Sequence, residues 1–156
     1  MFISRYDNKV DKKGRVSVPA AWRAVDSLRD PNCVAVFPSP NYGAIEGWSS
    51  ALMQQFSRSI GKLNPFSPQR NVFATSLLTN SVILSFDENG RILLPENIRA
   101  HAGSGDMATF AGLGESFQIW SPERFEVHQR EAMAQAQAVA ADFELIDPDF
   151  SGGEGA

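Results

Sequence analysis

The chain contains 156 residues, of which 43% are hydrophobic and 10% aromatic, a composition that supports a buried core and argues against disorder. Its formal net charge is −4, and its single cysteine, Cys33, excludes an intrachain disulfide and fits a reducing cytoplasm. The first residues lack the apolar core of a secretory signal, and no apolar run approaches the ~18 residues of a membrane span. We therefore expect a cytoplasmic protein without membrane contact.

Taken in chain order, the sequence predicts short strands alternating with short helices. In the first part, strands are expected over residues 2–6, 15–18, 33–37 and 44–48. Helices are expected there over residues 20–28, 50–61 and 68–78. In the second part, strands are expected over residues 82–86, 91–94, 106–111 and 117–120, with helices over 96–102 and 122–141. The pattern indicates a mostly β protein with peripheral helices.

An internal repeat relates the two parts. The stretch from Asp11 to Pro19 returns from Asp87 to Pro95, with identical Asp, Gly, Arg and Pro at corresponding positions. Arg23 and Arg99 also correspond, and apolar residues fall on apolar residues along the repeat. A repeat of this quality indicates a duplicated structural unit.

Each copy has the spacing of a tight hairpin turn. Asp11 and Asp87 can bond the turn backbone, while Gly14 and Gly90 can take the left-handed conformation that closes it. A strand with two-residue alternation follows, so the arginine after each glycine lies on the polar face. One interpretation of each Asp–Arg pair is a structural clasp across the turn. The other is that the arginine recognises a ligand.

Local charge separates these interpretations in the first copy. Residues 1–23 contain two acidic residues and six basic ones, which are Arg5, Lys9, Lys12, Lys13, Arg15 and Arg23. A basic cluster on a hairpin indicates nucleic-acid binding. We predict that Arg15 reads a base edge or phosphate, because a guanidinium can bond either in bidentate fashion, and that Arg5, Lys9, Lys12 and Lys13 contact phosphate.

The second copy differs because Asp87 and Glu88 surround Arg91 with negative charge. Arg91 is therefore predicted to act mainly as a clasp, and it is a weaker candidate for DNA contact. The net charge of −4 opposes DNA binding, but six acidic residues follow Arg130, a region without Lys or Arg. The rest of the chain holds twelve acidic and fourteen basic residues. Because salt screens distant charges, the local positive field at the first hairpin matters more for DNA binding than the net charge does.

The two Asp-x-x-Gly-Arg-(apolar)-x-(apolar)-Pro units resemble the tandem SpoVT-AbrB half-barrels of the MraZ family. The opening Met1-Phe2 and the stretch from Phe117 to Ser121 match the same family, and the likeness extends to about Gln137. The resemblance implies two pseudo-symmetric SpoVT-AbrB-like half-barrels that form one double-psi-type barrel core, followed by a C-terminal helix. The sequence also predicts the boundaries of the parts, of which the acidic tail lies outside the family pattern. They are a first unit over 1–61, a packed helical connector over 62–79, a second unit with the C-terminal helix over 80–141, and a disordered acidic, Gly-rich tail over 142–156.

The same resemblance implies a function. MraZ-like proteins are DNA-binding transcriptional regulators, generally repressors, that act on directly repeated boxes at the promoter of the division and cell-wall gene cluster. They assemble as homo-oligomeric rings. The expected partners of this chain are therefore double-stranded promoter DNA and further copies of itself, and the expected location is the cytoplasm, with the nucleoid.

Other functions are weighed against this one. An AbrB-type antitoxin would use the acidic tail to bind a toxin, and a ring-forming scaffold would have no nucleic-acid role. His101 and His128 lack companions at ligand spacing, so no metal or other cofactor is expected. No nucleophile–base or paired-carboxylate pattern occurs, so no enzymatic activity is expected.

Overall fold

The computed structural model describes residues 1–29 and 31–144. The chain divides into two compact units, Met1–Phe125 and Glu126–Ala156. In its described part, the second unit consists of most of a 19-residue helix and the short segment after it. From residue 145 onward, the predicted acidic tail lies outside the described residues.

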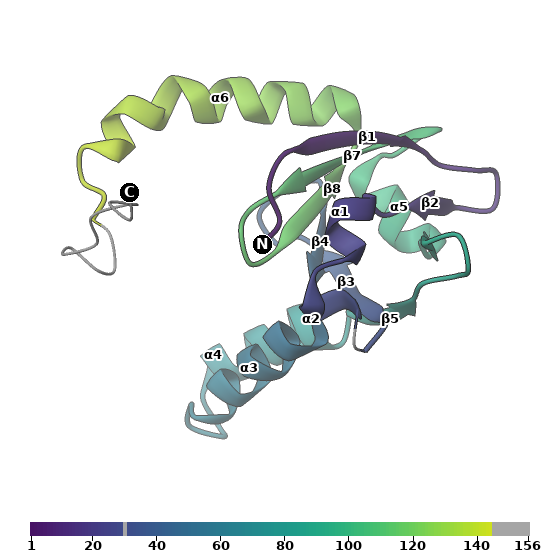
Figure 1. The fold of residues 1–156 in the computed structure, drawn as a ribbon. Coiled ribbons are helices and arrows are strands. Elements are labelled where there is room, and N and C mark those ends of the chain that lie inside the picture. Colours follow the sequence, from purple (N-terminus) through teal and green to yellow (C-terminus); the bar gives the residue numbers. More distant parts are fainter. Residues whose placement is uncertain (30, 145–156) are drawn as a thin grey trace, which may run out of the picture. The chain divides into compact units, whose positions relative to one another are not determined.

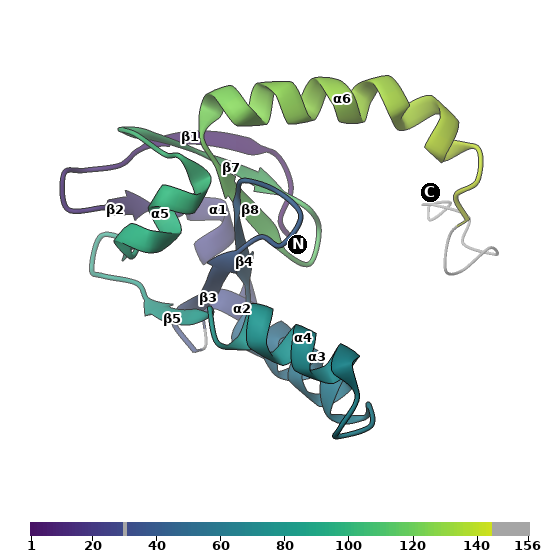
Figure 2. The same ribbon diagram turned by 180° about the vertical axis from the view of Figure 1, so that it is seen from behind.

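Eight strands and several helices make up the described chain. The strands are β1 (Arg5–Lys9), β2 (Arg15–Ser17), β3 (Cys33–Pro38), β4 (Ile45–Trp48), β5 (Val82–Ser85), β6 (Arg91–Leu93), β7 (Met107–Gly112) and β8 (Phe117–Trp120). The helices are α1 (Ala20–Arg23), α2 (Asp26–Arg29), α3 (Ser50–Gly61), α4 (Pro68–Phe73), the π-helical turn η1 (Ala74–Leu78), α5 (Glu96–Ala102) and α6 (Pro122–Ala140). Figures 1 and 2 show these elements from opposite sides.

Three predicted elements differ in detail. The first strand begins at Arg5 rather than Phe2, because Ser4 has a φ of 77° and breaks the extended backbone. The helix predicted over 20–28 divides into α1 and α2, since Val25 donates to the Trp22 carbonyl in a tight turn that brings Leu28 into the core. The helix predicted over 68–78 changes from α4 to the π-helical η1 at Ala74.

The main sheet is built from both copies of the repeat in mirrored order. Its six antiparallel strands follow the order β1-β7-β8-β4-β3-β5. In the repeat, β1 corresponds to β5, β3 to β7 and β4 to β8, so exchanging the copies leaves the order unchanged. Figure 1 shows the result at one edge, where the N-terminal strand β1 lies beside β7 from the second copy. Each copy therefore completes the sheet of the other.

A second, two-stranded ribbon joins the copies at their repeated motifs. Strands β2 and β6 pair in antiparallel fashion, with Val16 opposite its repeat equivalent Ile92. Val18 donates to the Gly90 carbonyl at 3.1 Å, and Leu94 donates to the Gly14 carbonyl at 3.0 Å. The two copies are thus related by a local pseudo-twofold axis that passes through the centre of this ribbon.

The larger of two hydrophobic clusters in the described residues lies under both sheets, and the smaller one consists of Ala44, Ala111, Trp120 and Phe125. Trp22 is 2% exposed and makes edge-on contacts with Phe2, Tyr6 and Phe110, while its Nε1 donates to the Ile3 carbonyl at 3.1 Å. The core cluster draws on both copies and consists of Phe2, Val10, Val16, Val18, Trp22, Leu28, Val34, Val36, Ile45, Ile92, Leu94, Ile98, Ala102, Ala108, Phe110, Phe117 and Ile119. Burial of these apolar side chains is the largest favourable contribution to folding.

The mostly β class with helices at the periphery is confirmed by this arrangement. In the view from behind, α3 and α4 lie together beyond the β3–β5 end of the sheet (Figure 2). None of the helices in residues 1–29 and 31–144 combines the length and the apolar character that a membrane crossing requires.

The backbone of Ser4 generates a stability prediction. Replacing Ser4 by Gly removes the cost of a positive φ, and we expect the free energy of unfolding to rise by about 0.5–1 kcal/mol. The matched control is Ser85→Gly in β5, where extended backbone should make the same change destabilising by about 0.5–1 kcal/mol. Urea denaturation of both variants measures the difference. Equal destabilisation by the two substitutions would contradict the assigned strain.

Candidate nucleic-acid interface

The first turn is closed by one carboxylate. Asp11 Oδ1 accepts hydrogen bonds from the backbone N–H groups of Lys13 and Arg15, both at 2.9 Å. Asp11 Oδ2 accepts from the side-chain Nε of Arg15 at 2.6 Å. Gly14 donates to the Asp11 carbonyl at 3.0 Å and has a φ of 92°, a conformation that favours glycine. The turn therefore fixes both the backbone and the arginine that follows it.

The second turn repeats this geometry. Asp87 Oδ1 accepts from the N–H groups of Asn89 at 2.8 Å and Arg91 at 2.9 Å. Asp87 Oδ2 accepts from Arg91 Nε at 2.9 Å, and Gly90 has a φ of 73°. The structural clasp is thus present in both copies.

Both clasps use the same edge of the guanidinium. Arg15 binds Asp11 through Nε, and its side chain is 36% exposed. Within the described part of the chain, its two Nη groups have no hydrogen-bond acceptor. Arg91 binds Asp87 in the same way, but its Nη1 also lies 4.0 Å from Asp11 Oδ2. The Nη groups of Arg15 are consequently available to an external acceptor, in an orientation that the clasp sets.

The clasps also lower the pKa values of both carboxyl groups. The backbone N–H of Arg15 is the main reason why the pKa of Asp11 falls from 3.8 to about 2, with further help from the Arg15 side chain and the Lys13 N–H. The backbone N–H of Arg91 lowers the pKa of Asp87 in the same sense. Both aspartates are therefore ionised at neutral pH and hold their arginines by charge-assisted hydrogen bonds.

Two arginines that sequence reasoning left without a role brace the turns across the copies. A Cβ built on Gly14 would lie 2.8 Å from Nε of Arg99, and one on Gly90 would lie 2.0 Å from Nη1 of Arg23. Each guanidinium therefore packs against the turn of the other copy, in space that only glycine leaves open. Arg23 Nε donates to the Val18 carbonyl at 3.0 Å, whereas Arg99 Nε is buried without an acceptor among the described residues. Their equivalent positions in the repeat are the signal that could have identified this role.

The predicted phosphate-contacting residues lie in two places. Lys9, Lys12 and Lys13 are exposed, Lys9 at the end of β1 and the others at the tip of the first turn. Arg5 lies at the opposite end of β1, so the structure does not bring it to the turn. Its Nε is 3.4 Å from Asp7 Oδ1, and its guanidinium lies 4.9 Å from the centre of the Phe125 ring.

The tips of the two turns differ in charge. Lys12 and Lys13 of the first turn correspond to Glu88 and Asn89 of the second, and all four residues are exposed. On the outer face of the ribbon between them, Arg15 lies opposite Leu93 and Ser17 opposite Arg91. The interface thus has one strongly basic end and one end of mixed charge.

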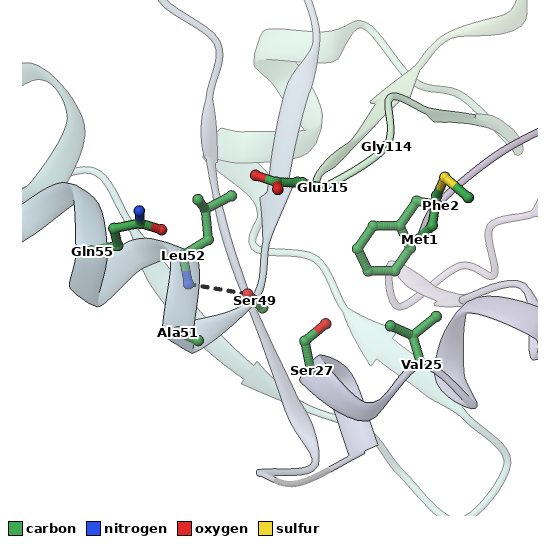
Figure 3. Close-up of a pocket in the computed structure, with 10 residues that line it drawn as sticks. All are labelled: Met1, Phe2, Val25, Ser27, Ser49, Ala51, Leu52, Gln55, Gly114 and Glu115. Carbon is green, nitrogen blue, oxygen red and sulfur yellow. Dashed lines mark hydrogen bonds between the residues drawn. The ribbon is translucent and has the colours of Figure 1, made fainter. Parts of the chain in front are cut away.

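A cavity of about 530 Å³ is a separate candidate site, formed by the N-terminus, α2, the start of α3 and the β7–β8 turn. Its walls are largely apolar, and Figure 3 shows Phe2, Val25 and Leu52 around it. The Ser49 hydroxyl caps α3 by accepting from Leu52 N at 3.1 Å, so it is engaged in local structure. The described residues contain no group of three or more His, Cys, Asp or Glu side chains that could hold a metal ion.

Comparison with known proteins points to one family. Residues 77–146 match a family model described as "MraZ protein, putative antitoxin-like". A transcriptional regulator MraZ from Pelagibacter ubique is 41% identical over 155 residues, which cover 99% of each chain. The MraZ regulator of Beijerinckia indica is 42% identical over 131 residues, covering 84% of this chain and 80% of the relative. That of Parvibaculum lavamentivorans is 43% identical over 132 residues, covering 84% and 82%.

The space above Gly14 leads to a prediction. Gly14→Ala would impose a positive φ on alanine and push its Cβ against Arg99, so we expect a loss of about 1–3 kcal/mol in the free energy of unfolding. Gly61→Ala at the end of α3 is the control, because a Cβ there meets nothing within 4 Å, and we expect no loss and a gain of up to about 1 kcal/mol since alanine favours the helix. Chemical denaturation tests both variants. Equal stability of the two would refute the tight packing of the turn.

The lowered pKa of Asp11 predicts how stability responds to acid. Folding lowers this pKa below its value of 3.8 in the unfolded chain, so the stabilisation is complete from about one pH unit above 3.8 and is lost as the pH falls toward about 2. Asp11→Asn should lower the melting temperature at neutral pH and flatten its decline between about pH 5 and pH 2.5. Glu131→Gln, which removes an exposed carboxylate on α6, controls for charge loss. Thermal melts of both variants across this pH range decide the outcome, and an unchanged acid slope in Asp11→Asn would contradict the clasp.

Proposed function

We propose a function for this chain from one premise, which is that it belongs to the MraZ family. The relatives in this family that resemble it across most of their length are named transcriptional regulators. We infer that this chain is also a transcriptional regulator, and that it binds double-stranded DNA through its first turn.

The single observation that carries this proposal is the cationic tip of that turn. Lys12 and Lys13 are exposed near Arg15 in the turn. The Arg15 Nη groups have no acceptor among the described residues and can donate hydrogen bonds to DNA. Lys9 is also exposed and lies at the end of β1, two residues before the turn. A surface of this kind meets the phosphate backbone with several positive charges at once, and such contacts supply most of the affinity for DNA.

Arg15 has the geometry required of a reading residue. Its Nε is held by Asp11, so the side chain loses less conformational freedom when it binds than an unrestrained arginine would. The remaining Nη groups can donate to guanine O6 and N7 or to phosphate oxygens, and a specific contact of this type contributes about 1–3 kcal/mol of discrimination. Lys9, Lys12 and Lys13 then act on phosphate and position the turn.

The other predicted contacts have weaker support. Arg91 is divided between Asp87 and Asp11 and stands beside Glu88, so we assign it mainly to the clasp. Arg5 is engaged with Asp7 and Phe125 and lies away from the turn, so any contact that it makes with DNA is peripheral. The net charge of −4 weakens this assignment without overturning it, because fields from distant acidic residues are screened over roughly 8 Å in physiological salt.

The finer parts of the function follow from the family resemblance. We propose that the chain represses the division and cell-wall gene cluster by occupying directly repeated promoter boxes as a multi-subunit ring, within the cytoplasm and at the nucleoid. One turn makes few contacts, so several subunits side by side would supply avidity. We also propose that the β2/β6 ribbon and the main sheet belong to one double-psi-type barrel core, which is supported by the bridge between Val10 and Val16 and by the shared core.

A second candidate is an antitoxin that binds a protein partner. The family model that matches residues 77–146 carries an antitoxin-like description, and this specific observation favours it. Such a protein would bind its partner through the second half or the acidic tail, and neutral salt would affect that complex less than a DNA complex.

The test compares the two arginines on a duplex from the region upstream of the chain's own gene. Arg15→Ala should weaken binding about tenfold or more, because it removes the reading contact, whereas Arg91→Ala should weaken it less than about threefold. Fluorescence anisotropy at several salt concentrations measures both affinities. With about four cationic contacts, from Lys9, Lys12, Lys13 and Arg15, the log affinity of the unmodified chain should fall with log salt at a slope of roughly −3 to −4.

Three outcomes would contradict the assignment of DNA binding to the first turn and of base reading to Arg15. Equal losses in Arg15→Ala and Arg91→Ala would mean that both turns read DNA. No loss in a folded Lys12, Lys13 and Arg15 triple alanine variant would remove the first turn from the interface. Salt-independent binding would favour the protein-partner alternative.

A further inference from the structure

The pseudo-twofold axis makes the two turns equivalent in backbone. Val16 lies opposite its equivalent Ile92, and in the main sheet Glu46 lies opposite its equivalent Gln118. Asp11 and Asp87 accept the same three hydrogen bonds within their turns. Any difference in what the turns bind must therefore come from their side chains.

The side chains around the first turn are mainly cationic. Its cations are Lys9, Lys12, Lys13 and Arg15, with Arg99 packed on Gly14. Its acidic residues are Asp11 and Asp106. Asp106 is included because its backbone carbonyl accepts a hydrogen bond from the backbone N–H of Val10, next to the turn. Five cations thus face two carboxylates at this end of the ribbon.

The equivalent positions around the second turn balance in charge. Arg91 and the packed Arg23 face Asp87 and Glu88. Ser85, Asn89 and Asn32 replace Lys9, Lys13 and Asp106 and carry no charge. The largest single change is at the tip, where an exposed glutamate stands in place of Lys12.

We propose that Glu88 is a specificity-determining residue that keeps the second turn off the phosphate backbone. Its carboxylate at the tip would meet phosphate oxygens of the same charge, and such a mismatch excludes a binding mode by repulsion. Each chain would then engage DNA through the first turn only, although both turns have the geometry to bind. This inference rests on the proposed function and adds the element that selects between its two equivalent turns.

The consequence is that each subunit has one orientation on DNA. A protein with twofold symmetry matches palindromic half-sites, because its two equivalent surfaces read the two strands in opposite directions. In this chain the charge difference removes that equivalence while the backbone keeps it. A subunit is therefore directed along the duplex, and Glu88 is the residue that enforces the direction.

The decisive experiment gives the tip of the second turn the charges of the first. It then asks whether Arg91 can replace Arg15 in DNA binding. The variant Glu88→Lys with Asn89→Lys gives the second turn the same tip as the first. With the upstream duplex as probe, we expect it to bind about threefold to tenfold more tightly at ~0.1 M salt, with a salt slope steeper by about one to two. Arg15→Ala, which should cost about tenfold in the natural background, should cost less than about threefold in this one.

Two controls make the result interpretable. Glu115→Lys matches the charge change of Glu88→Lys on an exposed position away from both turns, and it should alter affinity less than twofold. Thermal melts verify that each variant is folded. If the unmodified chain binds the duplex and Arg15→Ala costs the same in both backgrounds, the role of Glu88 is refuted while the proposed function stands. If the unmodified chain shows no salt-dependent binding, the proposed function itself fails and this inference with it.

Discussion

The pairing of β2 with β6 is the interaction on which the rest of the structure depends. Its register sets Val16 against Ile92, and the flanking bonds from Val18 and Leu94 end on the two turn glycines. This pairing therefore fixes the strands, the turns before them and the helices after them in one step. Arg23 and Arg99 reach across it to the turn of the opposite copy. A change in register by one residue would turn Val16 and Ile92 out of the core and Arg15 into it.

The aspartate clasp shows why a structural and a recognition role need not compete for one arginine. Asp11 holds Arg15 through Nε, and this bond leaves the Nη groups without an acceptor among the described residues. A long flexible side chain normally loses rotamer entropy on binding, and here the turn has already restricted it. Under the proposed function, the clasp that stabilises the fold is thus the same feature that would prepare the arginine for DNA. The repeat preserves the clasp in both copies, so the clasp alone does not distinguish them.

Local sequence signals predicted most of the elements and much of the candidate site. The spacing from Asp11 to Gly14 specifies its turn through bonds within a few residues, and alternation after it specifies the buried face of β2. The cross-copy order of the main sheet, the packing of Arg99 on Gly14 and the position of Arg5 over Phe125 depend on contacts between residues far apart in the chain. No local pattern encodes such contacts. The positive φ of Ser4 belongs to the same class, because bonds to the distant Gly112 and Gly114 segment hold that part of the backbone.

Duplication within one chain gives this fold a freedom that a symmetric dimer lacks. In a homodimer, a substitution at one turn appears at both, so the two surfaces keep the same charge. Here the residues equivalent to Lys12 and Lys13 are Glu88 and Asn89, on a backbone that the clasp and the brace hold unchanged. The interactions that maintain the turn come from the aspartate, glycine and arginine positions and from the backbone N–H of Lys13 or Asn89, whereas the exposed side chains at the tip take no part in them. Charge at the tip can therefore differ between the copies without cost to the fold, which is the physical condition for a single chain to bind with direction.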